Sequence, residues 1–133
     1  MLFIGFDETD DYAHRGSYDQ YLKSAHAQDA MIADLWKLLQ SKPAYNNKTT
    51  LVITVDHGRG DLVKEQWTSH GSDIAGAGEI WMAVIGPDTP SLGELDNGQV
   101  YQRQLATTFA ALLGLQFEPL HPVMHPIETM FRK

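Results

Sequence analysis

The chain has 133 residues, of which 43% are hydrophobic, so it is long enough to bury the core of one compact domain. Its 17 acidic and 10 basic residues give a formal charge of −7, which argues against a nucleic-acid partner, and the absence of cysteine excludes disulfides and thiolate metal ligands. No apolar run is long enough for a transmembrane helix and the residues after Met1 do not form a signal peptide, so no membrane partner is expected, while the compartment stays open.

Three short apolar runs predict strands that are covered on both faces: Leu2–Phe6, Leu51–Val55 and Ile80–Ile85. Between the first two, apolar residues recur at spacings of three and four from Tyr18 to Gln40, which predicts an amphipathic helix with Ser17 as its N-cap. A strand, a helix and a strand over this length imply a right-handed βαβ unit. The chain is therefore expected to have an α/β fold with a mainly parallel sheet.

The last third of the chain predicts one further helix and an irregular tail. The helix is expected over Val100–Leu113 and ends at Gly114, a suitable C′ residue. The tail, Gln116–Lys133, is expected to wrap the surface. It contains His121 and His125, but a proline follows each of them and breaks the helix that would align their side chains. We therefore interpret both histidines as tail residues without a metal.

The long segment Asp56–Glu79 separates two predicted strands and contains five glycines. A loop of this length in a compact domain is usually functional. Two predicted strands also end in acidic residues, because Phe6 precedes Asp7–Asp11 and Val55 precedes Asp56. Ligands of open α/β sheets gather beyond the carboxyl ends of strands, so both acidic clusters are expected at the same edge of the sheet.

Five side chains near this edge are candidate metal ligands: Asp10, His14, Asp56, His57 and His70. The first two are four residues apart and share a face if their segment is helical, and the next two follow directly after a strand. Mixed aspartate and histidine ligands suit zinc or a similar transition ion, whereas calcium prefers oxygen ligands alone. Two such ions about 4 Å apart would clamp the attacking and leaving oxygens of a displacement reaction. Taken singly, each residue has a structural alternative as a solvated pair, a cap or a loop hydrogen bond.

Three neighbouring residues compete for roles in this site. Asp7 and Asp11 are alternatives to Asp10, but the four-residue spacing to His14 favours Asp10. Arg59 follows the predicted ligands directly and is a candidate contact for a substrate oxyanion, although a solvated arginine is the favoured interpretation.

The order of these motifs resembles the C-terminal half of the alkaline phosphatase superfamily. This group includes nucleotide pyrophosphatase/phosphodiesterases, cofactor-independent phosphoglycerate mutases, phosphopentomutases and sulfatases. The matching segments are Asp10–His14, Thr49–Gly58, Ser69–Gly71, Ile80–Pro87 and Ala106–Gly114. The resemblance implies a partial α/β/α sandwich in which residues 1–133 form a single domain, the metal-binding half of a larger metallohydrolase.

The resemblance also implies two metal sites. Asp10, His14 and His70 would bind one divalent ion, and Asp56 and His57 would bind the second. Zinc is the expected metal at both sites, with manganese as the alternative if the mutase branch applies. In the family, the second metal also takes an aspartate and a Ser or Thr nucleophile from the N-terminal half. The chain is therefore expected to be a fragment.

The expected activity follows from this missing half. None of the nearby hydroxyls, Ser17, Thr54, Thr68 and Ser69, matches the family nucleophile, so no catalytic residue is assigned and the chain alone is expected to be inactive or weakly active. Its full-length form would act on small-molecule phosphate monoesters or diesters or on sulfate esters. The alternatives are a phosphosugar mutase and a non-catalytic, degenerate metal-binding module. An exposed sheet edge would favour a homo-oligomer.

Overall fold

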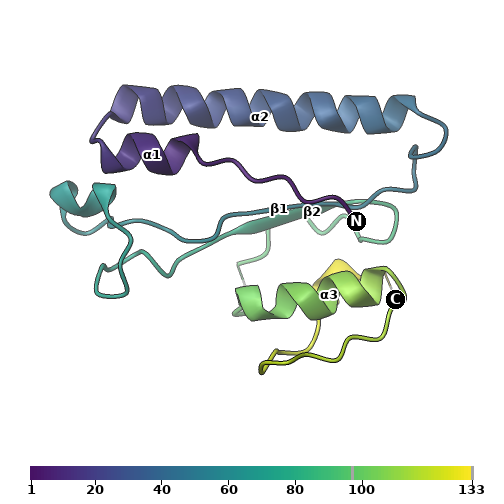
Figure 1. Cartoon of the computed structure of the whole chain (residues 1–133). Coiled ribbons are helices and arrows are strands. Elements are labelled where there is room, and N and C mark those ends of the chain that lie inside the picture. The colour runs from purple at the N-terminus through teal and green to yellow at the C-terminus, as the bar shows by residue number, and fades with distance from the viewer. Residues whose placement is uncertain (97, 133) are drawn as a thin grey trace. The chain divides into compact units, whose positions relative to one another are not determined.

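The computed structural model describes residues 1–96 and 98–132 (Figure 1). The chain divides into two compact units. Unit 1 comprises Met1–Asn46 and Thr54–Met82, and unit 2 comprises Asn47–Ile53 and Ala83–Lys133. The single domain predicted over residues 1–133 stays a prediction.

Unit 1 begins with an irregular segment followed by helix α1, Glu8–His14. Acidic residues in its first turn interact favourably with the positive end of the helix dipole. The helix ends where Gly16 adopts a positive φ of 68°, so that its N–H bonds the Ala13 carbonyl at 2.8 Å and the Ser17 N–H bonds the Tyr12 carbonyl at 2.9 Å. This is a Schellman motif, and it stops the helix directly after His14.

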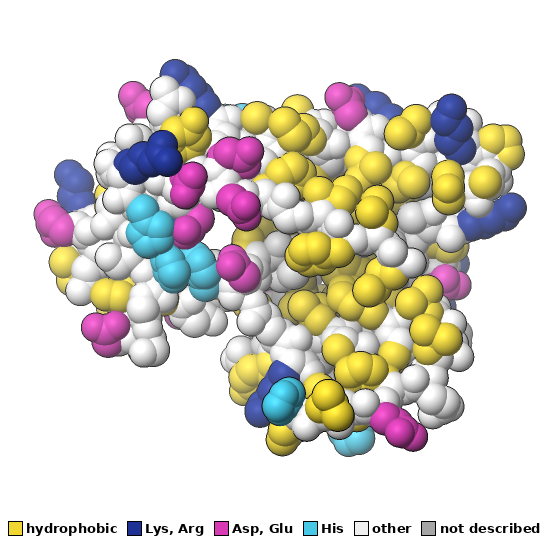
Figure 2. Space-filling model, viewed as in Figure 1, with side chains coloured by type: hydrophobic (Ala, Val, Ile, Leu, Met, Phe, Trp, Pro, Cys, Tyr) yellow, Lys and Arg dark blue, Asp and Glu magenta, His cyan; other side chains and the backbone are white. Residues whose placement is uncertain are grey.

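Helix α2, Tyr18–Ser41, confirms the predicted amphipathic helix. Ser17 holds its N-cap position as predicted, but the serine side chain makes no capping hydrogen bond. It runs back alongside α1, and the two helices pack together (Figure 1). Apolar residues of the predicted stripe are half-buried towards the C-terminal part of the helix, at Ile32, Leu35, Trp36 and Leu39. No residue of α2 is fully buried, and hydrophobic side chains also lie on the surface along this helix (Figure 2).

Two of the three predicted strands form. Strand β1, Leu51–Thr54, pairs with strand β2, Met82–Ile85, in a two-stranded sheet. The pair is antiparallel, because the Thr54 hydroxyl bonds the Trp81 carbonyl at 2.8 Å while Gly86 approaches Thr50 at the other end. The prediction of mixed helices and strands is thus confirmed. The mainly parallel sheet is not shown by the part of the chain that the structure describes.

The predicted strand Leu2–Phe6 is wrong. This segment has no strand structure, and its large side chains are exposed, Phe3 at 87% and Leu2 at 78%. A strand needs a neighbour that accepts and donates its main-chain hydrogen bonds, and the sheet contains only β1 and β2 among the described residues. The described residues therefore do not form the βαβ unit that depended on this strand either. The two strands that do form are only half covered, since β1 is half-buried throughout and β2 alternates between half-buried and exposed residues.

The long segment between the two strands is irregular except for the short 3-10 helix η1, Lys64–Thr68, which contacts α1. Two of its glycines are required by close backbone packing. A side chain at Gly58 would clash with the carbonyl oxygens of Gly76 and Glu79, and one at Gly60 would clash with Gln66. These contacts fold the segment back on itself, and the Gly58 N–H bonds the Ala77 carbonyl at 2.8 Å.

In unit 2, helix α3, Leu105–Leu112, follows the 3-10 turn η2, Gln102–Gln104. The helix predicted from Val100 starts later because the Tyr101 N–H donates to the Gln104 side chain at 2.9 Å, which caps the turn. Gly114 has a positive φ of 67° and ends α3 as predicted.

Most of the described tail is exposed, in keeping with the predicted surface wrap, but two of its residues belong to the core of unit 2. The short 3-10 helix η3 spans Glu128–Met130. Its last residue, Met130, is buried, and so is Ile127, which precedes it. The Ile127 N–H donates to the buried Thr108 hydroxyl at 2.9 Å, and the Thr89 hydroxyl donates to the Met130 carbonyl at 2.9 Å. Lys133, the last residue of the predicted tail, lies outside the described residues.

Among the described residues, no helix combines the length and the apolar character that crossing a membrane requires.

Candidate metal centre

Helix α1 presents two predicted ligands on one face. Asp10 and His14 are four residues apart, and the His14 Nε2 atom lies 3.2 Å from the Asp10 Oδ2 atom. The sequence predicted a shared face only if this segment is helical, and α1 meets that condition. The side chains are 40% and 46% exposed, so they can be reached from solvent.

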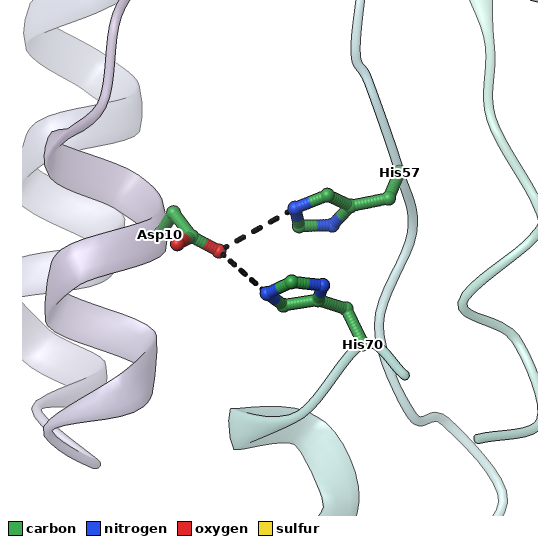
Figure 3. A group of neighbouring side chains, drawn as sticks. All are labelled: Asp10, His57 and His70. Carbon is green, nitrogen blue, oxygen red and sulfur yellow. Dashed lines mark ion pairs between the residues drawn. The ribbon is translucent and has the colours of Figure 1, made fainter. Parts of the chain in front are cut away.

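His57 and His70 approach the same carboxylate from the long segment after β1. Their rings are stacked, with centroids 3.7 Å apart and an angle of 10° between the planes. Each Nε2 atom lies 3.6 Å from the Asp10 Oδ1 atom (Figure 3). One carboxylate oxygen therefore faces two imidazole nitrogens that come from residues far away in the sequence.

The remaining contacts join all five predicted ligands into one cluster within unit 1. The His14 and His70 Nε2 atoms are 3.0 Å apart, and the Asp56 Oδ2 atom lies 3.7 Å from the His57 Nε2 atom. Asp56 is at the margin, with its side chain 88% exposed, and its other oxygen accepts the His57 N–H at 3.1 Å. Figure 2 shows histidine side chains gathered at one place on the surface, next to acidic side chains.

The spacing of these atoms fits a divalent metal ion. Two ligand atoms bound about 2.1 Å from one tetrahedral zinc ion lie roughly 3.4 Å apart. The contacts of Asp10 with three histidines, at 3.2 Å, 3.6 Å and 3.6 Å, are close to this value. The ligand atoms of Asp10, His57 and His70 all lie within 4.8 Å of one another. A metal is thus compatible with the donor set, and how the five residues divide between two ions stays a prediction.

The tautomer of His57 also suits a ligand. Its Nδ1 atom lies 2.9 Å from the Gly58 carbonyl oxygen. Because a carbonyl oxygen only accepts hydrogen bonds, Nδ1 carries the hydrogen, and in the neutral ring Nε2 keeps the lone pair that a metal requires. Metal-binding histidines commonly donate their other ring N–H to a carbonyl or carboxylate in this way.

Arg59 is the site residue that the sequence interpretation missed. The favoured interpretation of a solvated side chain is wrong, since the side chain is only 14% exposed and its Nη2 atom donates to the Asp10 carboxylate. The signal that the sequence offered was the pair of glycines on either side, which let the chain pack closely around this residue.

The competing residues lie outside the cluster. Asp11 is 65% exposed and pairs with Arg15 at 3.4 Å, and Asp7 occupies the N-cap position of α1. The hydroxyls of Thr54 and Thr68 donate to main-chain carbonyls, of Trp81 at 2.8 Å and of Glu65 at 3.3 Å. The geometry therefore favours Asp10 over its neighbours, and it gives both threonines a local structural role.

Comparison with known families gives one match. A model described as the Metalloenzyme superfamily matches residues 1–86, a range that contains all five predicted ligands and Arg59. Neither the curated proteins nor the solved structures yield a match.

Proposed function

The chain belongs to the Metalloenzyme superfamily, and from this premise we propose that it supplies the metal ligands of a metal-dependent ester hydrolase. The observation that carries this proposal is the convergence of three imidazole nitrogens, of His14, His57 and His70, on the carboxylate of Asp10. A bound divalent ion would supply Lewis-acid chemistry, stabilising the negative charge that develops on the oxygens of a phosphoryl or sulfuryl group.

We further propose two ions, arranged as the resemblance to the alkaline phosphatase superfamily implies. Asp10, His14 and His70 would hold the first, and Asp56 and His57 the second. Two contacts within the proposed sites support this division: the His57 Nε2 atom lies 3.7 Å from the Asp56 Oδ2 atom, and the His14 and His70 Nε2 atoms are 3.0 Å apart. Zinc suits the nitrogen-rich donor set, and manganese is the alternative.

The proposed substrates are phosphate monoesters or diesters, with sulfate esters as the third class. The chain carries a formal charge of −7, so an anionic substrate needs local positive charge. Metal ions bound by this cluster would supply such charge. Histidine at position 57 favours the phosphate classes, because the sulfatases of the resembling group use oxygen-rich calcium sites.

A second candidate function is a non-catalytic metal-binding module. The hydroxyls of Thr54 and Thr68 favour this function, because both donate to main-chain carbonyls. Neither threonine is therefore assigned as the nucleophile that catalysis would require. A phosphosugar mutase would share the metal ligands and would transfer the phosphoryl group between hydroxyls.

Assays with nitrophenyl phosphate, bis-nitrophenyl phosphate and nitrophenyl sulfate, with zinc added, test the proposed reaction. We expect weak turnover of a phosphate ester that a chelator abolishes and that His57→Ala lowers at least about tenfold, since its ring would bind the metal. The matched control is His26→Ala, because His26 is an exposed histidine of α2 outside the cluster. Turnover that neither the chelator nor His57→Ala lowers would contradict the metal-dependent hydrolase, and zinc binding without any turnover would favour the metal-binding module.

A further inference from the structure

The backbone of Arg59 is held in place by close packing at the two glycines next to it. It lies between Gly58 and Gly60, and any side chain at these two positions would clash with the facing loop. The backbone of Arg59 is therefore fixed two residues after His57. Its guanidinium reaches out of this turn towards α1 and is 14% exposed.

The guanidinium has three acceptors, on two separate segments. Its Nη2 atom donates to the Asp10 carboxylate and lies 3.4 Å from the Asp10 carbonyl oxygen, and its Nη1 atom lies 3.5 Å from the Trp67 carbonyl oxygen. Arg59 thus connects the start of α1 with η1, the helix that leads to His70. These are the segments that carry two of the three converging ligands.

We propose that Arg59 is a positioning residue of the metal centre, which orients the Asp10 carboxylate towards His57 and His70. The proposal rests on the proposed metal binding. The carboxylate oxygen that accepts from Arg59 is the same Oδ1 atom that lies 3.6 Å from both imidazole nitrogens. An ionised carboxylate oxygen offers two lone pairs, so one can accept the guanidinium hydrogen while the other faces the ion.

Two other roles for Arg59 are less well supported by these contacts. A substrate-binding arginine would keep donors free towards solvent, whereas both terminal nitrogens of Arg59 face acceptors within the chain. An arginine that competes with the metal for Asp10 would need no further anchors, yet the two carbonyl contacts hold it in one orientation. The planar fork of arginine can donate to several acceptors at once, which the single ammonium of lysine cannot do with the same geometry.

Titration of the chain with Co²⁺, followed by calorimetry and by the visible absorption of the bound ion, tests this role. The variants are Arg59→Gln and Arg59→Lys. The matched control is Arg15→Gln, which removes a cation next to His14 from an exposed pair with Asp11 at 3.4 Å. Removing a positive charge should by itself tighten cation binding, because like charges repel. Weaker binding after Arg59→Gln would therefore come from lost positioning.

We expect Arg59→Gln and Arg59→Lys each to raise the Kd for Co²⁺ 10- to 100-fold and to change the absorption spectrum of the bound ion, the range typical for partners of metal ligands. Arg15→Gln should leave the Kd within about threefold of the original, since the Arg15 side chain is exposed and pairs with Asp11, which lies outside the cluster. Unchanged or tighter binding by Arg59→Gln would overturn the proposal. Binding by Arg59→Lys as tight as that of the original chain would overturn the role given to the planar guanidinium, because any cation beside Asp10 would then be enough.

Circular dichroism separates a folding defect from a positioning defect. If Arg59→Gln does not fold, the Arg59→Lys result decides, because lysine keeps the charge beside Asp10. The failure of this inference is also distinct from the failure of the proposed function. If the original chain binds no Co²⁺ or Zn²⁺, both fail, whereas equal binding by the original chain and Arg59→Gln overturns the role of Arg59 alone.

Discussion

The carboxylate of Asp10 contacts the side chains of three histidines and one arginine. Its two oxygens face different partners, since Oδ2 lies 3.2 Å from His14 while Oδ1 lies 3.6 Å from His57 and from His70. An isolated carboxylate needs one cationic partner to be stabilised. Asp10 already has one in Arg59, so the three imidazole nitrogens that also face it are better explained by a metal ion that they share with the carboxylate.

Asp10→Asn tests this residue without changing its shape. Because asparagine is neutral and offers a weaker oxygen ligand, we expect the Kd for Zn²⁺, measured by calorimetry, to rise at least about tenfold. Asp34→Asn is the matched control, since Asp34 is a helical aspartate with a side chain 79% exposed and a surface partner, Lys37. Equal losses in the two variants would show that general charge, and not the cluster, controls binding.

Among residues, the sequence predicted which side chains lie together better than it predicted their surroundings. The five candidates follow from residue type, spacing and the resemblance, and the structure brings them together. Arg59 was misjudged because its burial depends on α1 and η1, whose distance from the arginine cannot be read from local spacing. The burial of a charged residue depends on partners that are remote in the sequence.

At the scale of elements, local sequence patterns predicted well where the long helix α2 lies and where α3 ends. The periodicity of α2 and the C′ role of Gly114 depend on neighbouring residues, and both are confirmed. Ser17 holds the predicted N-cap position, although its side chain makes no capping hydrogen bond. The strand predicted over Leu2–Phe6 was wrong because strand formation depends on residues that are distant in the sequence. An apolar run indicates that a strand is favourable, but only a hydrogen-bonded neighbour makes one, and that information is not local. The position of Asp10 consequently depends on the packing of α1, and not on the end of a strand as expected.

The segment between β1 and β2 depends on glycine at specific positions. Gly58→Ala should lower the free energy of unfolding by about 1–3 kcal/mol, because the added methyl group would overlap the carbonyl oxygens of Gly76 and Glu79. Urea unfolding followed by circular dichroism measures this change.

Gly78→Ala is the control within the same segment, because a side chain there meets no atom within 4 Å. We expect it to be neutral or to stabilise the chain by up to about 1 kcal/mol, through a less flexible unfolded state. A result in which both variants destabilise equally would show that the segment does not hold the close packing described for Gly58.

For the molecule as a whole, the described core is small. The buried hydrophobic residues are Ala13, Ala77, Ile127 and Met130. Composition predicted enough apolar residues for a core, but it does not determine which of them are covered, and Leu2 and Phe3 remain exposed. A metal that binds only the folded chain would add stability that this core does not supply, by about 2.7 kcal/mol at a concentration 100 times its Kd.

Zinc content after equilibrium dialysis, measured by elemental mass spectrometry, tests the central claim most directly. The claim is that the Asp10, His14, Asp56, His57 and His70 cluster binds divalent metal. We predict at least one zinc ion per chain, retained in the control variant His26→Ala and lost when Asp10 and His57 are both replaced by Ala. A chain that retains no zinc, or one whose zinc content is unchanged by that double replacement, would contradict the metal centre.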